Sequence, residues 1–301
     1  MLEYIIFALS LAALLYSAKL ITDSAIHFAR VLGASDFIVG ATVVALGTSL
    51  PELSSSIEAM HAGLPGIVIG NVIGSNIANI ALVLGITSIF YIIKTKRNIL
   101  KKDIPFLFIS AFATAIVLID FKITLIEGIM LLATYLAYLA YSIKIHKDHD
   151  KHKKTKLKPS SILLFFIGVA GIIYAAKYLI SSSTLIMHSF GISEAIIGFI
   201  LIAIGTSLPE LATSIVAARK GKTDLMIGDI IGSNTFNSLV VLGASSTIGT
   251  VSASSSFITA ALPSMLLLTL FLAYVVYDKK ITKLEGATLL TLYIIILAVI
   301  L

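Results

Sequence analysis

Two short motifs rich in oxygen-bearing side chains each occur twice in this chain of 301 residues. The copies are GTSLPEL at 47–53 and 205–211, and G-(N/D)-x-I-G-S-N-x-x-N at 70–79 and 228–237. Glu52 and Glu210 fall inside long apolar runs, where an ionised carboxylate is costly unless a partner compensates it. No basic residue lies deep in any of these runs. A bound cation is therefore the expected partner of both glutamates.

Hydroxyl groups accompany each glutamate at helical spacing. In a helix, positions i, i+3, i+4 and i+7 share one face. The residues at these positions are Ala45, Thr48, Ser49 and Glu52 in the first copy, and Ala203, Thr206, Ser207 and Glu210 in the second. Pro51 and Pro209 lack the N–H that would bond the carbonyl four residues earlier, so we expect freed carbonyl oxygens beside each glutamate.

The second motif adds further oxygen donors. Ser75 and Asn79 lie four residues apart, as do Ser233 and Asn237. Ca²⁺ takes six to eight oxygens at about 2.3–2.6 Å in a tolerant geometry, whereas Mg²⁺ demands a stricter octahedron. The all-oxygen set therefore favours Ca²⁺. Two carboxylates balance one divalent ion, and an emptied site would leave two negative charges in a low dielectric. We expect a second cation to replace the first, which is exchange.

Other residues near the motifs are expected to have lesser roles. The glycines of the second motif form small-xxx-small pairs, which predict close helix packing rather than ligation. Glu58 and Asp229 lie inside apolar runs without an acidic mate in the other copy, so they rank below the paired glutamates. Asp23 is expected to pair with Lys19, four residues away.

Composition places the whole chain in a membrane. Hydrophobic residues make up 58% and charged residues 13%, and the mean hydropathy is +1.03. A helix needs about 20 apolar residues to cross a bilayer, and continuous apolar runs favour helices over barrel strands. Ten runs qualify, near residues 2–21, 36–60, 66–91, 104–120, 124–144, 160–182, 194–218, 225–248, 257–277 and 284–301. The predicted fold class is an all-α integral membrane protein with ten transmembrane helices. The chain has no cysteine, which excludes thiolate sites.

The charge distribution predicts the orientation. With the amino terminus outside, 19 of the 22 Lys and Arg residues fall in cytoplasmic loops, so the positive-inside rule puts both termini outside. The net charge of +6 is thus explained by topology and by contact with anionic lipid, and no nucleic-acid partner or obligatory protein partner is expected. We predict a multi-pass protein of the cell membrane.

The sequence contains an internal duplication. An offset of 158 residues aligns 40–85 with 198–243 without a gap, and 23 of the 46 positions are identical. Each copy holds five predicted spans, an odd number, so the second copy must be inverted relative to the first. The predicted organisation is a first five-helix repeat at 1–145, a basic cytoplasmic linker at 146–159 and an inverted second repeat at 160–301.

The paired GTSLPE and G-x-x-x-G-S-N-x-x-N segments resemble the two alpha-repeats of the cation/Ca²⁺ exchanger superfamily, in particular its prokaryotic Na⁺/Ca²⁺ exchangers. The resemblance implies that Glu52 and Glu210 hold Ca²⁺ together with backbone oxygens of Thr48 and Thr206. It implies Na⁺ positions that use Ala45, Ser49, Ser75, Ala203, Ser207 and Ser233, with Asn79 and Asn237 around the centre. It further implies that the first and sixth helices slide across the other eight.

One position departs from the pattern of some relatives, which carry Asp at the place of Asn237. The departure leaves Glu52 and Glu210 as the only deep carboxylates with repeat mates.

The predicted function is antiport of Ca²⁺ against Na⁺ by alternating access, with no cofactor and no enzymatic activity. H⁺/Ca²⁺ antiport on the same fold is the alternative, since desolvated glutamates can carry protons.

Three other classes fit the sequence less well. An intramembrane hydrolase would need a general base or a pair of deep aspartates, and the six histidines lie in loops or near span ends. A scaffold without transport would not need two buried glutamates. A channel is disfavoured because a two-carboxylate site holds its ion tightly and inverted repeats suit alternating access.

Overall fold

The computed structural model describes residues 2–94, 103–146, 155–189, 205, 207–277 and 279–300, and these are almost entirely helical. The first half contains α1 (Leu2–Leu32), α2 (Asp36–Val39), η1 (Gly40–Val44), α3 (Ala45–Thr48), α4 (Leu50–His61), α5 (Pro65–Ala78), η2 (Asn79–Val83), α6 (Leu84–Phe90), α8 (Ile104–Val117) and α9 (Leu125–His146). The second half contains α10 (Pro159–Ser189), α12 (Leu208–Arg219), α13 (Thr223–Phe236), η3 (Asn237–Val241), α14 (Leu242–Ser246), α15 (Ser255–Tyr277) and α16 (Lys283–Ile300). The segments η1, η2 and η3 are π-helical.

Among the described residues, seven helices are long and apolar enough to cross a membrane, and a bent pair, Asp36–Thr48 with Leu50–His61, makes eight. An all-helical membrane protein is therefore confirmed. The two other predicted spans correspond to α8, an apolar helix of 14 residues, and to α12, which follows the undescribed residues 190–204. The count of ten stays a prediction.

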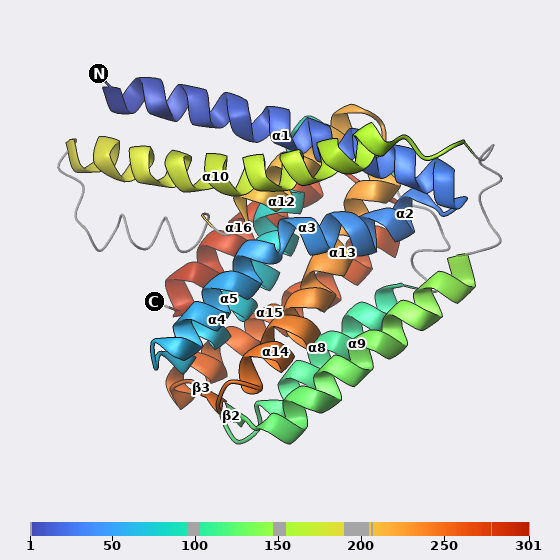
Figure 1. Ribbon diagram of the computed structural model, residues 1–301. Coiled ribbons are helices and arrows are strands. Elements are labelled where there is room, and N and C mark those ends of the chain that lie inside the picture. Colours follow the sequence, from blue (N-terminus) through green and yellow to red (C-terminus); the bar gives the residue numbers. More distant parts are fainter. Residues whose placement is uncertain are drawn as a thin grey trace.

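Two helices of equal length form a layer across the others. Both α1 and α10 have 31 residues, so each is about 46 Å long, well beyond the roughly 30 Å hydrocarbon core, and must tilt to stay within it. The sequence predicted a first span ending near residue 21, but the helix continues to Leu32. They lie side by side along their length (Figure 1). Gly168 and Gly171 allow this approach, since a Cβ there would meet Ile21 and Ser17 of α1.

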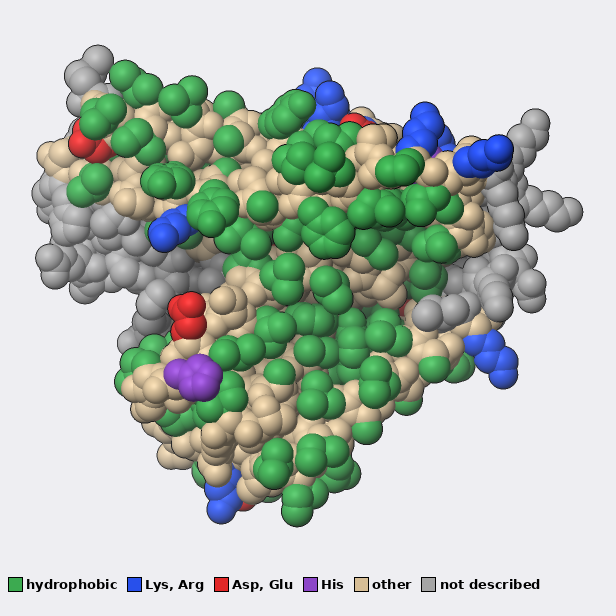
Figure 2. All heavy atoms as spheres, viewed as in Figure 1, with side chains coloured by type: hydrophobic (Ala, Val, Ile, Leu, Met, Phe, Trp, Pro, Cys, Tyr) green, Lys and Arg blue, Asp and Glu red, His purple; other side chains and the backbone are tan. Residues whose placement is uncertain are grey.

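The outer surface is apolar where lipid would lie. Large hydrophobic side chains such as Phe90, Phe166 and Tyr274 are more than 60% exposed. Figure 2 shows hydrophobic side chains spread over the visible face, with Lys and Arg mostly at its margins. Apolar surface of this extent is unfavourable in water and suits a bilayer.

Two short strand pairs tie the halves of the chain together. The strands are β1 (Ile93–Lys94), β2 (Lys122–Ile123), β3 (Val251–Ser252) and β4 (Lys280–Ile281). The first pairs with the fourth and the second with the third, both antiparallel. The 158-residue offset maps β1 onto β3 and β2 onto β4. The β1–β4 pair is therefore the repeat mate of the β2–β3 pair, which is the relation that a two-fold axis between the halves requires. This arrangement supports the predicted repeat.

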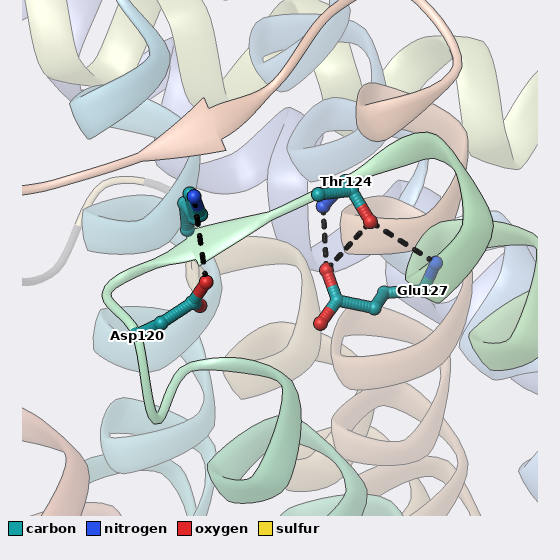
Figure 3. Close-up of polar contacts among 4 residues, drawn as sticks. Asp120, Thr124 and Glu127 are labelled. Carbon is teal, nitrogen blue, oxygen red and sulfur yellow. Dashed lines mark hydrogen bonds and ion pairs between the residues drawn. The ribbon is translucent and has the colours of Figure 1, made fainter.

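Capping boxes follow two of these strands. The Glu127 carboxylate accepts hydrogen bonds from the Thr124 backbone N–H at 2.7 Å and from its hydroxyl at 2.8 Å, next to the Asp120–Lys122 ion pair (Figure 3). Glu285 caps α16 through Thr282 in the same way. Both glutamates therefore lie in the first turn of their helices, where each caps the helix start.

Two ion pairs at the turn between α12 and α13 connect distant segments. Lys220 pairs with Asp23 of α1, and Lys222 pairs with Asp36 at 2.8 Å. The predicted Asp23–Lys19 pair is wrong, because the folded chain brings a closer cation from the second repeat to Asp23. These contacts hold the start of α13 against the first half of the chain.

Candidate cation-binding site

The first motif forms a broken helix. Between α3 and α4 the backbone leaves helical geometry at Ser49, which has φ −90° and ψ 6°, and the axis bends by 42°. Pro51 lies in the first turn of α4, where its missing N–H is tolerated. Ser207 before α12 has φ −91° and ψ 6°, so both copies share this geometry. The single continuous face predicted across 45–52 is therefore interrupted.

The break places each glutamate in the first turn of a helix. Glu52 occupies that position in α4 and Glu210 in α12. The positive end of the helix dipole stabilises a carboxylate there, although by far less than the cost of burial. Both side chains are 0% exposed. No Lys, Arg or His forms an ion pair with either of them in the described ranges.

Hydroxyl groups of the motifs reach these carboxylates. Ser75 donates to Oε1 of Glu52 at 3.5 Å, and Ser49 donates to Oε1 of Glu210 at 3.3 Å. The second contact joins one repeat to the other. Both distances exceed the usual 2.7–2.8 Å of O–H···O bonds, so these contacts are weak. Oε2 of each glutamate has no hydrogen-bond partner within the part of the chain that the structure describes.

Amide groups lie at the starts of two π-helical segments. Asn79 begins η2 and Asn237 begins η3. The Asn79 amide donates to Oδ1 of Asn234 at 3.0 Å, but its own Oδ1 has no described partner. Both polar atoms of Asn237 and the hydroxyl of Ser207 are also buried without described partners. Buried polar atoms are normally paired, so this group of orphaned oxygens has the chemistry of a site for a hard cation.

The structure adds a third carboxylate that sequence reasoning placed below the glutamates. Asp229 is 1% exposed, and it accepts hydrogen bonds from Thr48 at 3.3 Å and from Thr213 at 2.9 Å. Thr48 is itself a predicted site residue. Asp229 also lies one turn before Ser233, a spacing that could have indicated its position. Glu58, by contrast, is exposed on α4 and takes no part in the site.

The remaining predicted residues divide into two groups. The Ala45 carbonyl lies 3.4 Å from the Thr48 hydroxyl, so it belongs to the same cluster. Ala203 and Thr206 lie outside the described residues. Across the described ranges, no group of three or more His, Cys, Asp or Glu side chains could hold a metal ion. Ligation would therefore rest on hydroxyl, amide and backbone oxygens as much as on carboxylates.

Glycines bring neighbouring helices close to the site. A Cβ on Gly228 would lie 2.2 Å from the Phe37 carbonyl oxygen, and one on Gly232 would lie 2.4 Å from that of Ala41. These contacts confirm packing for these two glycines. Gly47 and Gly205, which are repeat mates, both face α10. Helix α10 therefore covers both broken segments.

Comparison with known proteins gives a consistent relationship. The chain matches the family described as sodium/calcium exchanger protein over residues 2–144 and 160–301. It is 35% identical to an uncharacterised membrane protein of Methanocaldococcus jannaschii over 295 residues, covering 97% of this chain and 96% of the relative. It is 30% identical to the sodium/calcium exchanger MaX1 of Methanosarcina acetivorans, covering 99% and 98%.

Solved structures agree with the sequence comparison. The sodium-calcium exchanger NCX_Mj, soaked with Na⁺ and Sr²⁺, superposes with a TM-score of 0.85 at 33% identity, covering 99% of this chain and 98% of that one. At this identity and coverage the similarity extends over the whole chain. The protein therefore belongs to the sodium/calcium exchanger family of membrane transporters.

Proposed function

We propose that this protein exchanges Ca²⁺ for Na⁺ across a membrane by alternating access, with Ca²⁺ held between Glu52 and Glu210. The observation that carries the proposal is the pair of repeat-related glutamates, both 0% exposed, each with an unpartnered carboxylate oxygen and no cationic side chain beside it in the described ranges. Two buried negative charges need about two positive charges nearby, and one Ca²⁺ supplies them.

The ligands follow from the contacts around the two carboxylates. Backbone oxygens of Thr48 and Thr206 complete the Ca²⁺ position, because each residue comes directly before a serine, Ser49 or Ser207, at which the backbone departs from helical geometry. The amides of Asn79 and Asn237 surround the centre. Na⁺ occupies positions lined by Ala45, Ser49, Ser75, Ala203, Ser207 and Ser233. The NCX_Mj structures, obtained after soaking with Na⁺ and with Ca²⁺ or Sr²⁺, support these ions as the transported pair.

Charge explains why transport is coupled. After Ca²⁺ leaves, the two glutamates cannot remain bare in a low-dielectric site, so the empty protein does not change conformation readily. Na⁺ ions that enter neutralise the carboxylates and allow the return step. Leakage in one direction is thereby suppressed, and Ca²⁺ movement is tied to Na⁺ movement.

Access requires helices to move, because both glutamates are closed off in this conformation. The pair α1 and α10 covers the broken segments and makes a separate layer, so its sliding across the remaining helices would open one side at a time. The proposal includes ten spans, two inverted repeats at 1–145 and 160–301 joined by the linker 146–159, and both termini outside. The Lys- and Arg-rich loops then face the cytoplasm.

Replacing Glu52 by Gln should abolish transport. The variant keeps the shape of the side chain but removes one of two charges, and Ca²⁺ affinity depends on ligand charge, so affinity should fall by about 100-fold or more. Uptake of radiolabelled Ca²⁺ into Na⁺-loaded proteoliposomes measures the effect. Glu58→Gln, on the exposed side of the same helix, is the matched control and should transport normally. Normal uptake by Glu52→Gln would refute the assigned ligand.

The counter-ion is identified by comparing two driving forces. An outward Na⁺ gradient should drive Ca²⁺ uptake by the unmodified protein, whereas a pH gradient of equal magnitude without Na⁺ should not. Uptake in proteoliposomes with the membrane potential clamped gives the comparison. Uptake that follows the pH gradient and ignores Na⁺ would instead indicate H⁺/Ca²⁺ antiport.

Disulfide cross-links should distinguish sliding of α1 and α10 together across the other helices from movement of α1 relative to α10. A Cβ at Gly171 lies 3.3 Å from Ser17 Cβ, so the pair Ser17→Cys and Gly171→Cys joins α1 to α10. The oxidised protein should keep transporting, because these helices move together. A Cβ at Gly47 lies 3.1 Å from Val169 Cγ2, so Gly47→Cys with Val169→Cys joins α10 to α3, and oxidation should stop transport.

Since the natural chain has no cysteine, only the engineered pairs can react. Each oxidised sample is compared with the same protein after reduction, and the single variant Gly47→Cys controls for damage to the motif. Transport by the oxidised Gly47–Val169 pair would contradict sliding of α10 across the broken helix.

A further inference from the structure

The buried aspartate of α13 is not explained by a centre built from two glutamates. Asp229 is 1% exposed and receives three hydroxyl contacts, from Thr213 at 2.9 Å, Thr48 at 3.3 Å and Ser233 at 3.5 Å. No Lys, Arg or His forms an ion pair with it in the described ranges. Its charge is therefore held by neutral hydroxyls alone, which is a costly arrangement.

The Thr48 hydroxyl beside Asp229 has several contacts that are longer than ordinary hydrogen bonds. The Thr48 hydroxyl lies 3.2 Å from the Val44 carbonyl, 3.4 Å from that of Ala45, 3.3 Å from Oδ1 of Asp229 and 3.4 Å from the Ser233 hydroxyl. One hydroxyl proton cannot be donated to the two carbonyls and the carboxylate together, the Ser233 hydroxyl can itself be the donor in its contact, and each distance exceeds the usual O–H···O length. Oxygen ligands about 2.4 Å from a cation and at right angles lie about 3.4 Å apart, so this spacing suits a small cation.

The matching position in the other repeat is different. Asn71 makes ordinary hydrogen bonds from its amide nitrogen, at 3.0 Å to the Glu52 carbonyl, 3.1 Å to Ser55 and 2.9 Å to Ser56. It is only partly buried and carries no charge. In the first repeat Ser75 contacts Glu52, whereas in the second its mate Ser233 contacts Asp229 instead. The asymmetry therefore begins at the Asn71/Asp229 position.

We propose that Asp229, with Thr48 and Ser233, gives this transporter a negatively charged monovalent-cation position on one side of the divalent centre only. The inference rests on the proposed function, because Na⁺ is the cation that would occupy the position. One carboxylate balances one monovalent charge. Asp229 contacts Thr48, Thr213 and Ser233, whereas Glu52 contacts Ser75 and Glu210 contacts Ser49, so we assign Asp229 to a position adjacent to the Ca²⁺. It thereby tunes Na⁺ affinity and leaves the Ca²⁺ ligands intact.

Two assays on proteoliposomes test the proposal. The first measures the Na⁺ concentration that gives half-maximal release of radiolabelled Ca²⁺, and the second measures Ca²⁺/Ca²⁺ exchange without Na⁺. For Asp229→Asn the Na⁺ concentration should rise by about tenfold or more, because a buried cation loses its counter-charge. Ca²⁺/Ca²⁺ exchange should keep its half-saturating concentration within about twofold, because the two glutamates are unchanged. Asp224→Asn, in the first turn of the same helix, is the matched control and should alter neither.

Either of two results for Asp229→Asn overturns the proposal. An unchanged Na⁺ dependence would make the aspartate structural, and an equal loss of Na⁺ and Ca²⁺ affinity would make it part of the divalent centre. If this variant does not fold, Asp229→Glu tests the proposal instead, because it keeps the negative charge but moves it by one methylene group. That variant must shift the Na⁺ dependence and retain Ca²⁺/Ca²⁺ exchange. A lack of Na⁺ response in the unmodified protein would instead refute the proposed function itself, so the two failures are distinguishable.

Discussion

The structure is organised around two carboxylates, Glu52 and Glu210, that are fully enclosed without a basic partner in the described ranges. A buried pair of like charges is unstable unless metal cations or protons neutralise it, because each bare charge costs several kcal/mol. In the proposed exchange, this single constraint couples the movement of one ion to that of the other. It also accounts for the polar interior of a chain that is otherwise apolar, because oxygens of Ser, Thr, Asn and the backbone can complete such a site.

The surrounding backbone serves the same constraint. Departures from helical geometry at Ser49 and Ser207 come directly before the helices in which each glutamate lies in the first turn, and π-helical segments begin at Asn79 and Asn237, the two amides of the candidate site. Irregular backbone in a membrane is tolerated where it lines a polar site, and π segments recur at functional positions. The layer formed by α1 and α10 passes over both breaks because Gly47 and Gly205 have no side chain there. In the proposed mechanism, movement of that layer would therefore change the geometry of the proposed ligands.

The sequence predicted the helical membrane fold from the length of its apolar runs. It predicted the family from the duplicated motifs, whose residues are close together in the chain. It could not predict which residues meet across the repeats. Asp23 pairs with Lys220 rather than with its helical neighbour Lys19, and Asp229 joins Thr48 of the other repeat. Both contacts depend on how α13 packs against the first half of the chain, through Gly228 and Gly232. The π-helical segments that begin at Gly40, Asn79 and Asn237 were not predicted either.

The central claim is that Glu52 and Glu210 hold one Ca²⁺ together and that Na⁺ displaces it. Equilibrium binding of Ca²⁺ to the purified protein in detergent, with and without Na⁺, tests this claim most directly. The account predicts one high-affinity Ca²⁺ per chain, competition by Na⁺, and loss of that Ca²⁺ in either Glu52→Gln or Glu210→Gln. High-affinity Ca²⁺ binding that survives replacement of both glutamates would contradict it.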